Sequence, residues 1–228
     1  MTGQILISQR MVAMVNALYD ISPKLTPRTA VFPGDVPFLA TKHLGFDRGD
    51  HLMLSSIQTT VHVGAHADAP CHYHEQGADI SACDLNKYLG LCQVVTVENA
   101  AQNGRIYPHH IASVKISAPR VLFRTHSFTD PEHWSPDFFS LSPEMIEYLA
   151  PQGVCTVGID TPSVDPHDSK ELETHQALHR HDFAVLEGLT LSAVPDGEYT
   201  LIALPLPLVG LDASPVRAVL LPPRTPLI

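Results

Sequence analysis

Short apolar runs separated by proline, glycine and polar clusters dominate the chain, a pattern typical of buried strands joined by shaped loops. The segment from Leu52 to Val61 alternates in part between apolar and polar residues and is rich in β-branched side chains, which predicts a strand. The same features predict further strands at residues 19–22, 93–97, 120–125, 154–159, 201–204 and 218–221.

Helices are predicted between several of these strands. Ser142 can cap a helix start, Pro143 suits the first turn, and Glu144 is favourable at the positive end, so a helix is expected from there to about Ala150. Further helical segments are expected at residues 4–18, 108–114 and 169–179. Because strands and helices alternate along much of the chain, the predicted fold class is α/β, with a mixed β-sheet core flanked by helices.

Length and composition fit one globular domain. The chain has 228 residues, of which 44% are hydrophobic and 17% are charged, so it can bury a sizeable core and disorder is not expected. No internal repeat, linker or low-complexity segment divides the chain.

Charge and cysteine content exclude several classes of function. A net charge of -10 without a basic run argues against nucleic acid and against an anionic membrane as partners. No apolar run approaches the roughly eighteen residues of a spanning helix, and the N-terminus lacks the features of a signal peptide. The cysteines show no C-x-x-C pair and no disulfide spacing, which favours a reduced, cytoplasmic location.

The chemistry of the chain is concentrated between His62 and His72. Three histidines and Asp68 fall within this stretch, and imidazole nitrogen and carboxylate oxygen are ligands of zinc, manganese and iron(II). A straight strand would separate His62 and His66 by about 13 Å, so the chain must bend near Gly64 if both bind one ion. His66 and Asp68 can share one face of an extended piece. The alternative is a histidine-rich surface loop, since the chain has 14 histidines.

A second group of candidate ligands comes from the C-terminal half. His175 and Glu187 are twelve residues apart and would lie about 18 Å apart along one unbroken helix. They can meet at a metal only if the chain turns between them, for which residues 179–182 are a plausible place. From the residues alone, a surface histidine and a solvated helix end are the simpler interpretation.

With both regions considered, the sequence resembles the cyclase-like metal-dependent hydrolases, and within them the bacterial kynurenine formamidases (arylformamidases). The superfamily motif H-x-G-[TA]-H-x-D-x-P-x-H is matched from His62 to His72. The segments that resemble the formamidase branch are residues 19–23, 64–70, 158–166, 186–189 and 210–218. The resemblance covers nearly the whole chain, as a domain from residue 18 to residue 228. Residues 1–17 are then an N-terminal extension without an assigned role.

The resemblance implies a swivelling β/β/α fold, a homodimer or higher homo-oligomer, and a binuclear metal site, usually of zinc, with manganese as an alternative. Carried over by motif, His62, His66 and Asp68 would bind the first metal, while Asp68, His175 and Glu187 would bind the second. His72 would be the catalytic acid/base, a role that suits histidine near neutral pH. The implied reaction is hydrolysis of N-formyl-L-kynurenine to L-kynurenine and formate.

One departure from the family concerns the substrate pocket. The family usually has tryptophan before Pro-Gly-Asp, where it lines the pocket, and here that residue is Phe32. Phe32 is therefore a candidate substrate-binding residue whose ring lacks the indole N–H. From composition alone, Phe32 is either a core anchor of its loop or a pocket wall, and the anchor is favoured.

Several alternatives stay open at this point. Asp160 and Asp165 either orient ligand histidines or cap their loop, and the loop role is favoured. Cys71 is a less suitable nucleophile, because in an extended piece it and His72 would point to opposite faces. The metal chemistry could act instead on another small amide or a cyclic imide, as in isatin hydrolases. A non-catalytic metal-binding protein would take up metal and hydrolyse nothing.

Overall fold

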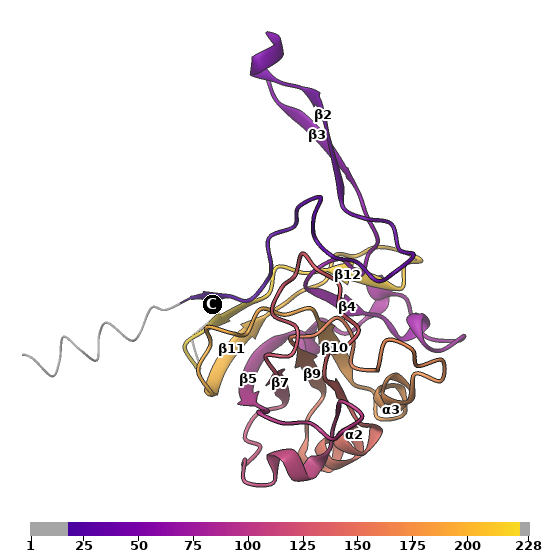
Figure 1. The fold of residues 1–228 in the computed structure, drawn as a ribbon, viewed down its shortest axis with the longest axis vertical. Helices are drawn as coiled ribbons and strands as arrows, with labels where there is room; N and C mark the ends of the chain where they lie inside the picture. The colour runs from indigo at the N-terminus through magenta and orange to yellow at the C-terminus, as the bar shows by residue number, and fades with distance from the viewer. Residues whose placement is uncertain (1–17, 224–228) are drawn as a thin grey trace, which may run out of the picture.

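A nine-stranded mixed sheet forms the centre of the molecule (Figure 1). The computed structural model describes residues 18–223, so the predicted helix at 4–18 and the extension at 1–17 lie outside the described residues, apart from Leu18. In sheet order the strands are β1 (Tyr19–Asp20), β13 (Val219–Leu221), β11 (Gly197–Ile202), β5 (Leu89–Thr96), β7 (Arg120–Arg124), β9 (Thr156–Ile159), β10 (Ala184–Glu187), β4 (His66–Asp68) and β12 (Ala213–Pro215). Neighbours from β5 to β10 are parallel and all other neighbours are antiparallel.

Two α-helices pack against each other and against one face of this sheet. They are α2 (Pro143–Leu149) and α3 (Glu173–Arg180). Short 3-10 helices are η1 (Phe46–Arg48), η2 (Pro70–His72), η3 (Ile80–Ala82), η4 (Leu85–Lys87), η5 (Pro108–Ile111) and η6 (Ala150–Gln152). Two small sheets complete the described structure, pairing β2 (Leu39–Leu44) with β3 (Leu54–Gln58) and β6 (Arg105–Ile106) with β8 (Ser140–Leu141).

Side chains alternate along the central strands between two apolar cores. On β7, Val121 and Phe123 pack on the helix side, whereas Leu122 points to the opposite side. That opposite core is filled by the outer strands of the curled sheet and by loop residues, for example Ile21 and Leu201. The predicted α/β class with a mixed sheet is confirmed, with the difference that the described α-helices cover one face of the sheet.

The predicted helix start is correct for α2 and too early for α3. Ser142 caps α2 as predicted, because its Oγ accepts a hydrogen bond from the backbone N–H of Met145 at 3.3 Å. The α3 helix begins at Glu173, later than predicted, since Leu172 before it has a left-handed backbone with φ of 47°. A left-handed residue cannot belong to a right-handed helix, so residues 169–172, which were predicted to be helical, lie outside α3.

The strand predicted at residues 52–61 forms, but it does not belong to the central sheet. Strand β3 pairs only with β2, and the two strands project from the body as an arm that carries η1 at its tip (Figure 1). Every residue of β3 is exposed. Alternation and β-branched residues indicate a pleated strand, but they do not tell which other surface will cover it.

Two glycines bring the end of β10 against the loop before β4. Gly64 and Gly188 both have a left-handed backbone, with φ of 61° and 64°. A Cβ added at Gly188 would lie 2.2 Å from the carbonyl oxygen of Gly64, a distance that no side chain tolerates. This close approach is required for the ends of β4 and β10 to meet.

We expect Gly188→Ala to destabilise the fold by about 2 kcal/mol more than Gly153→Ala. Gly153 is a matched control, because it also has a left-handed backbone, with φ of 80°, but open space where a Cβ would be. Urea unfolding of both variants measures the difference. Equal loss of stability would contradict a close contact at Gly188.

Candidate metal centre

The antiparallel pairing of β4 with β10 brings the two sequence regions together. His66 lies opposite Glu187, and Asp68 lies opposite Val185. Cross-strand partners share a face, and so do residues two apart on one strand. His66, Asp68 and Glu187 therefore all project from the face that also carries α3. The predicted bend at Gly64 and the predicted shared face of His66 and Asp68 are both confirmed.

Helix α3 adds the fourth side chain from above this face. Its chain turns at residues 181–182, where Asp182 has a left-handed backbone, and then enters β10. This is the turn predicted between His175 and Glu187. As a result, His175 Nε2 lies 3.4 Å from Asp68 Oδ2 and 3.5 Å from Glu187 Oε1.

Several donor atoms in this cluster are buried and have no hydrogen-bond partner in the described part of the chain. They are His66 Nε2, both carboxylate oxygens of Asp68, and His175 Nε2. Buried polar atoms are normally paired, and leaving them unpaired is costly. Nitrogen and oxygen atoms that converge without forming hydrogen bonds fit a divalent cation of the zinc or manganese type.

The donor atoms form two groups that share Asp68. One group is His66, Asp68 and Glu187, and the other is His62, Asp68 and His72; within each group the atoms lie within 4.8 Å of one another. A shared carboxylate fits two ions side by side. All five predicted ligands thus come together, although His66 is grouped with Glu187 rather than with His62, and His72 is also close enough to be a ligand.

Carboxylates behind the cluster orient its histidines. Asp165 Oδ2 lies 2.8 Å from His175 Nδ1, and Arg105 Nη1 lies 2.9 Å from Asp165 Oδ1. Burial raises the pKa of Asp165, but contacts with His175 outweigh it and lower the pKa to about 2. Asp165 therefore has both of the roles considered for it. It fixes the His175 ring with Nε2 toward Asp68, and it also accepts hydrogen bonds from the backbone N–H groups of residues 174 and 175. Asp160 has the favoured capping role, because it accepts hydrogen bonds from the backbone N–H groups of residues 125 and 126.

Asp212, which local sequence patterns do not single out, contacts two of the candidate site residues. Its Oδ2 lies 3.0 Å from His62 Nε2 and 3.1 Å from His72 Nδ1. The residue precedes β12, which pairs with β4 and so returns to the site. Its position in the family-like run at residues 210–218 was the signal that could have identified it.

His72 lies at the rim of the cluster and is exposed. It ends the 3-10 helix η2, so the extended geometry assumed for Cys71 and His72 is wrong. Cys71 is nevertheless a poor nucleophile, because burial and the nearby charge of Asp212 raise the pKa of its thiol. All four cysteines are free thiols.

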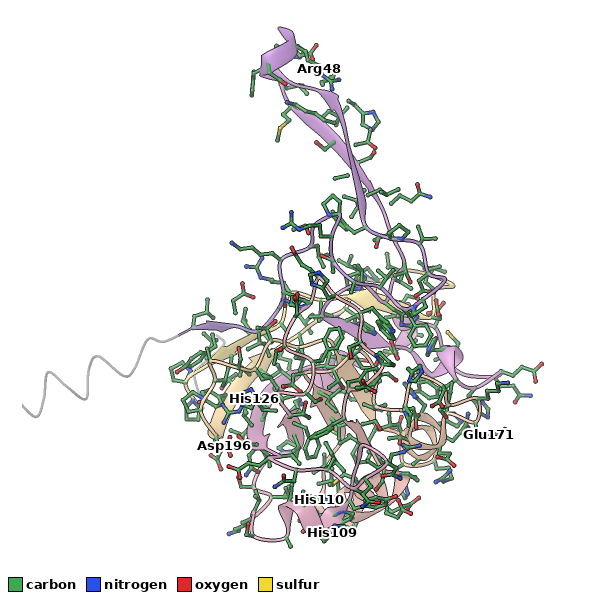
Figure 2. All side chains as sticks on the ribbon, in the orientation of Figure 1. Arg48, His109, His110, His126, Glu171 and Asp196 are labelled. Carbon is green, nitrogen blue, oxygen red and sulfur yellow. The ribbon has the colours of Figure 1, made fainter. Side chains whose placement is uncertain are left out.

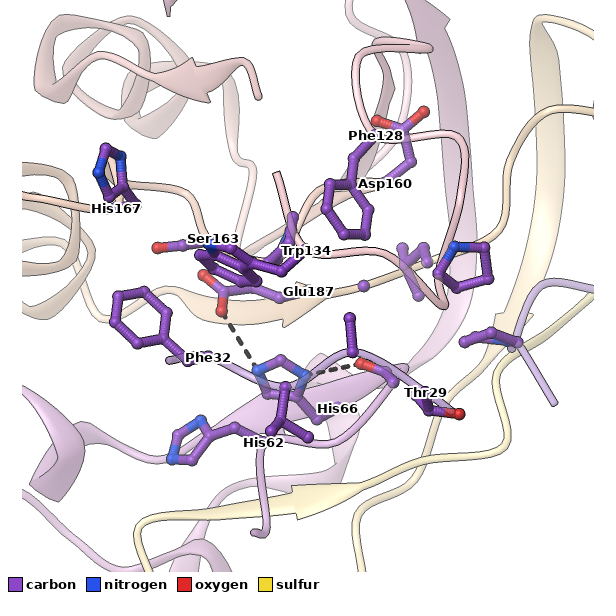
Figure 3. A pocket seen from close by; sticks show the side chains of 18 of the residues that line it. Thr29, Phe32, His62, His66, Phe128, Trp134, Asp160, Ser163, His167 and Glu187 are labelled. Atoms are coloured by element: carbon purple, nitrogen blue, oxygen red, sulfur yellow. Dashed lines mark hydrogen bonds and ion pairs between the residues drawn. The ribbon is translucent and has the colours of Figure 1, made fainter. Parts of the chain in front are cut away.

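The cluster forms one side of a cavity of about 480 Å³ that also has an aromatic side (Figure 3). His62, His66 and Glu187 lie on the polar side, where the close-up marks the 3.2 Å contact between His66 Nε2 and Glu187 Oε2. Phe32 and Trp134 line the aromatic side. Phe32 is 40% exposed, so the favoured interpretation as a core anchor is wrong and the pocket-wall interpretation fits.

Metal uptake should depend on pH through His62. Burial opposes its charge, but contacts with Asp68 and Asp212 outweigh burial and raise the pKa of the metal-free ring to about 9. A protonated ring cannot bind metal, so below pH 9 binding must displace this proton and affinity falls as the pH falls. We expect zinc affinity to rise at least about tenfold from pH 7 to pH 8, measured by competition with a chelator. The slope of log zinc affinity against pH should be lower by about one proton in His62→Asn. A zinc affinity of the wild type that does not change with pH would contradict His62 as a ligand.

Similarity to known proteins agrees with this geometry. The model of the cyclase family, described as "Putative cyclase", matches residues 19–166. A solved structure described as a potential metal-dependent hydrolase with cyclase activity is 29% identical, with 92% of this chain and 100% of that chain covered and a TM-score of 0.78. A predicted metal-dependent hydrolase from Bacillus stearothermophilus is also 29% identical, with 90% and 98% covered and a TM-score of 0.76.

Isatin hydrolase A from Labrenzia aggregata shares the fold at 19% identity, with 95% of this chain and 98% of that chain covered and a TM-score of 0.75. Within residues 18–223, no helix has the length and apolar character needed to cross a membrane. Since the family match spans well over half of the sequence and the fold agrees along nearly all of it, this chain belongs to the cyclase family.

Proposed function

We propose that this protein is a metal-dependent amide hydrolase that converts N-formyl-L-kynurenine to L-kynurenine and formate. The observation that carries the proposal is the set of buried nitrogen and oxygen atoms without hydrogen bonds on one side of a cavity whose other side is aromatic. The relatives described as metal-dependent hydrolases support the reaction class. The sequence resemblance to formamidases supports the substrate.

The proposed metal ligands are His62, His66, Asp68, His175 and Glu187, for two zinc ions per chain or for manganese. Bound ions of this kind lower the pKa of water and polarise a carbonyl group. The protein holds the ligands in place through their outer contacts, such as the 2.9 Å contact of His66 Nδ1 with the Gly64 carbonyl oxygen.

His72 is the proposed acid/base. Asp212 contacts its Nδ1, which leaves Nε2 to exchange a proton with water or substrate. In the proposed reaction, the oxygen of water bonds to the formyl carbon and the C–N bond breaks. His72 takes one proton of the attacking water and gives it to the departing nitrogen, so that the amine leaves neutral. The formic acid formed at the same time loses the second proton of that water to solvent and leaves as formate.

We expect His72→Ala to keep its metal and to lose about 10²–10⁴-fold of its turnover of N-formyl-L-kynurenine. The test measures metal per chain and absorbance-monitored hydrolysis on the same sample of wild type and variant. His109→Ala is the matched control, because His109 is exposed at the end of the molecule opposite the arm (Figure 2). About two chelator-removable metals per wild-type chain together with hydrolysis would support the proposal.

Three other outcomes would change it. Loss of metal in His72→Ala would make His72 a ligand, consistent with its closeness to His62 and Asp68. Metal without hydrolysis of the formamide, but with hydrolysis of isatin, would move the substrate to a cyclic imide, as in the structural neighbours that are isatin hydrolases. Metal without any hydrolysis would support a non-catalytic metal-binding protein.

We also propose that two copies of the chain form a homodimer through the β2–β3 arm. Phe46, Met53 and Ile57 on this arm are each about two-thirds exposed or more, at 70%, 65% and 66%. A two-stranded hairpin is marginally stable alone, and exposed apolar patches mark interaction sites. Further exposed apolar side chains, Leu206 and Val209, lie outside the arm. In a two-fold dimer each arm could pack on the body of its partner, so both sets of side chains would be covered reciprocally.

The double variant with Met53→Ser and Ile57→Ser should therefore shift the protein from dimer to monomer. Light scattering coupled to size-exclusion chromatography gives the mass directly. Leu85→Ser is the control, since Leu85 is an exposed apolar residue outside the arm and should leave the dimer intact. A monomeric wild type, or a double variant that stays dimeric, would contradict the arm as the interface.

A further inference from the structure

Trp134 is the only tryptophan of the chain, and it lies on the wall of the cavity that holds the candidate metal centre. Its ring meets Phe32 edge to face, with centroids 4.9 Å apart and planes at 67°. The rings of Phe128 and Phe138 lie next to it, with centroids 6.4 Å and 6.1 Å from the centroid of Trp134. In Figure 3, Phe32, Trp134 and Phe128 lie on one side of the cavity, and His62 and His66 lie on the other.

The two loops that carry this aromatic wall are fastened to each other. The backbone N–H of Ala30 donates to the carbonyl oxygen of Pro131 at 2.8 Å, and Arg28 pairs with Glu132 at 2.7 Å. These contacts lie two to four residues from Phe32 and Trp134. The loop that carries Trp134 is also held at its start, where buried Asp160 accepts hydrogen bonds from the backbone N–H groups of Thr125 and His126. Because the wall is fixed before a ligand arrives, less conformational entropy is lost when a ligand binds.

We propose that Trp134 sets the substrate range of this site, by forming with Phe32 the wall that receives a flat aryl group attached to the reacting amide. The inference rests on the proposed amide hydrolysis and specifies the part of the substrate that the protein selects. A flat ring makes offset or edge contacts with both aromatic rings, whereas a puckered aliphatic ring of similar size cannot. Discrimination between such rings is therefore the property that Trp134 controls.

Formanilide and N-cyclohexylformamide are matched probes, because they differ in the flatness of the ring beside the same formamide. In Trp134→Leu we expect kcat/KM for formanilide to fall about 10- to 100-fold, mostly through KM. Trp134→Phe, which keeps a flat ring, should lose less than about fivefold. The inhibition constant of N-cyclohexylformamide as a competitor should change less than about threefold in either variant. Phe139→Leu, at a nearby aromatic residue that does not line the cavity, is the control for general loop damage.

The result would overturn the proposal if Trp134→Leu hydrolysed formanilide within threefold of wild type, or if affinity for both probes fell together. An equal loss in Phe139→Leu would likewise indicate a structural effect on the loop. A rise in KM for formanilide in Trp134→Leu with kcat retained, together with a KM close to wild type in Trp134→Phe, would support a role in specificity.

A binding measurement keeps this proposal separate from the proposed function. Since Trp134 is the only tryptophan, the intrinsic fluorescence of the metal-loaded wild type or of its His72→Ala variant reports on this wall directly. Saturable quenching by formanilide, stronger than by N-cyclohexylformamide, would support the aryl site even if no amide were hydrolysed. Absence of quenching by formanilide at concentrations that inhibit the enzyme, or up to its solubility limit if nothing is hydrolysed, would overturn it.

Discussion

Asp68 is a carboxylate whose two oxygens are both buried and neither of which is hydrogen bonded, and a charge in that position has to be balanced by its neighbours. Three histidine rings supply the surroundings, with His62 at 3.0 Å, His66 at 3.4 Å and His175 at 3.4 Å from its oxygens. Burial raises the pKa of Asp68, but these neighbours lower it far below its usual range. Such an arrangement is costly as an empty polar pocket and favourable as a cation site.

Much of the surrounding structure can be understood as what this carboxylate requires. The paired left-handed glycines Gly64 and Gly188 let two chain segments approach closely enough for β4 and β10 to place His66 opposite Glu187. A second layer of acceptors then fixes the rings, with the Gly64 carbonyl behind His66, Asp165 behind His175, and an Asp212 contact to His62. Each ring thereby keeps one nitrogen for the centre, which is how ligand histidines are commonly positioned.

The cavity extends this constraint to substrate selection. Its polar side can hold an amide carbonyl and water at fixed positions, while the aromatic side can hold the group attached to the amide. The two sides come from different parts of the chain. The proposed ligands come from β4, α3 and β10 and the residues near them, whereas Phe32 and Trp134 come from two loops joined by Arg28 and Glu132. Substrate range can therefore change through the loops without disturbing the ligands, which lie on regular elements.

The sequence by itself indicated the candidate metal-binding residues and part of the regular structure, including the strands β5, β7 and β9 and the helix α2, but not the strands β4 and β10. The spacing of His66 and Asp68 on one face, the bend at Gly64 and the cap at Ser142 follow from local geometry, because each depends on residues within a few positions. Tertiary structure decided that His175 and Glu187 join them, which the family resemblance implied but local geometry did not. Likewise, it decided that Asp212 contacts His72 and that Trp134 lies beside Phe32. It also decided that the strand at residues 54–58 leaves the body as an arm. These relations depend on which distant strands and loops become neighbours, and local periodicity carries no information about that because it measures only which face of an element is apolar.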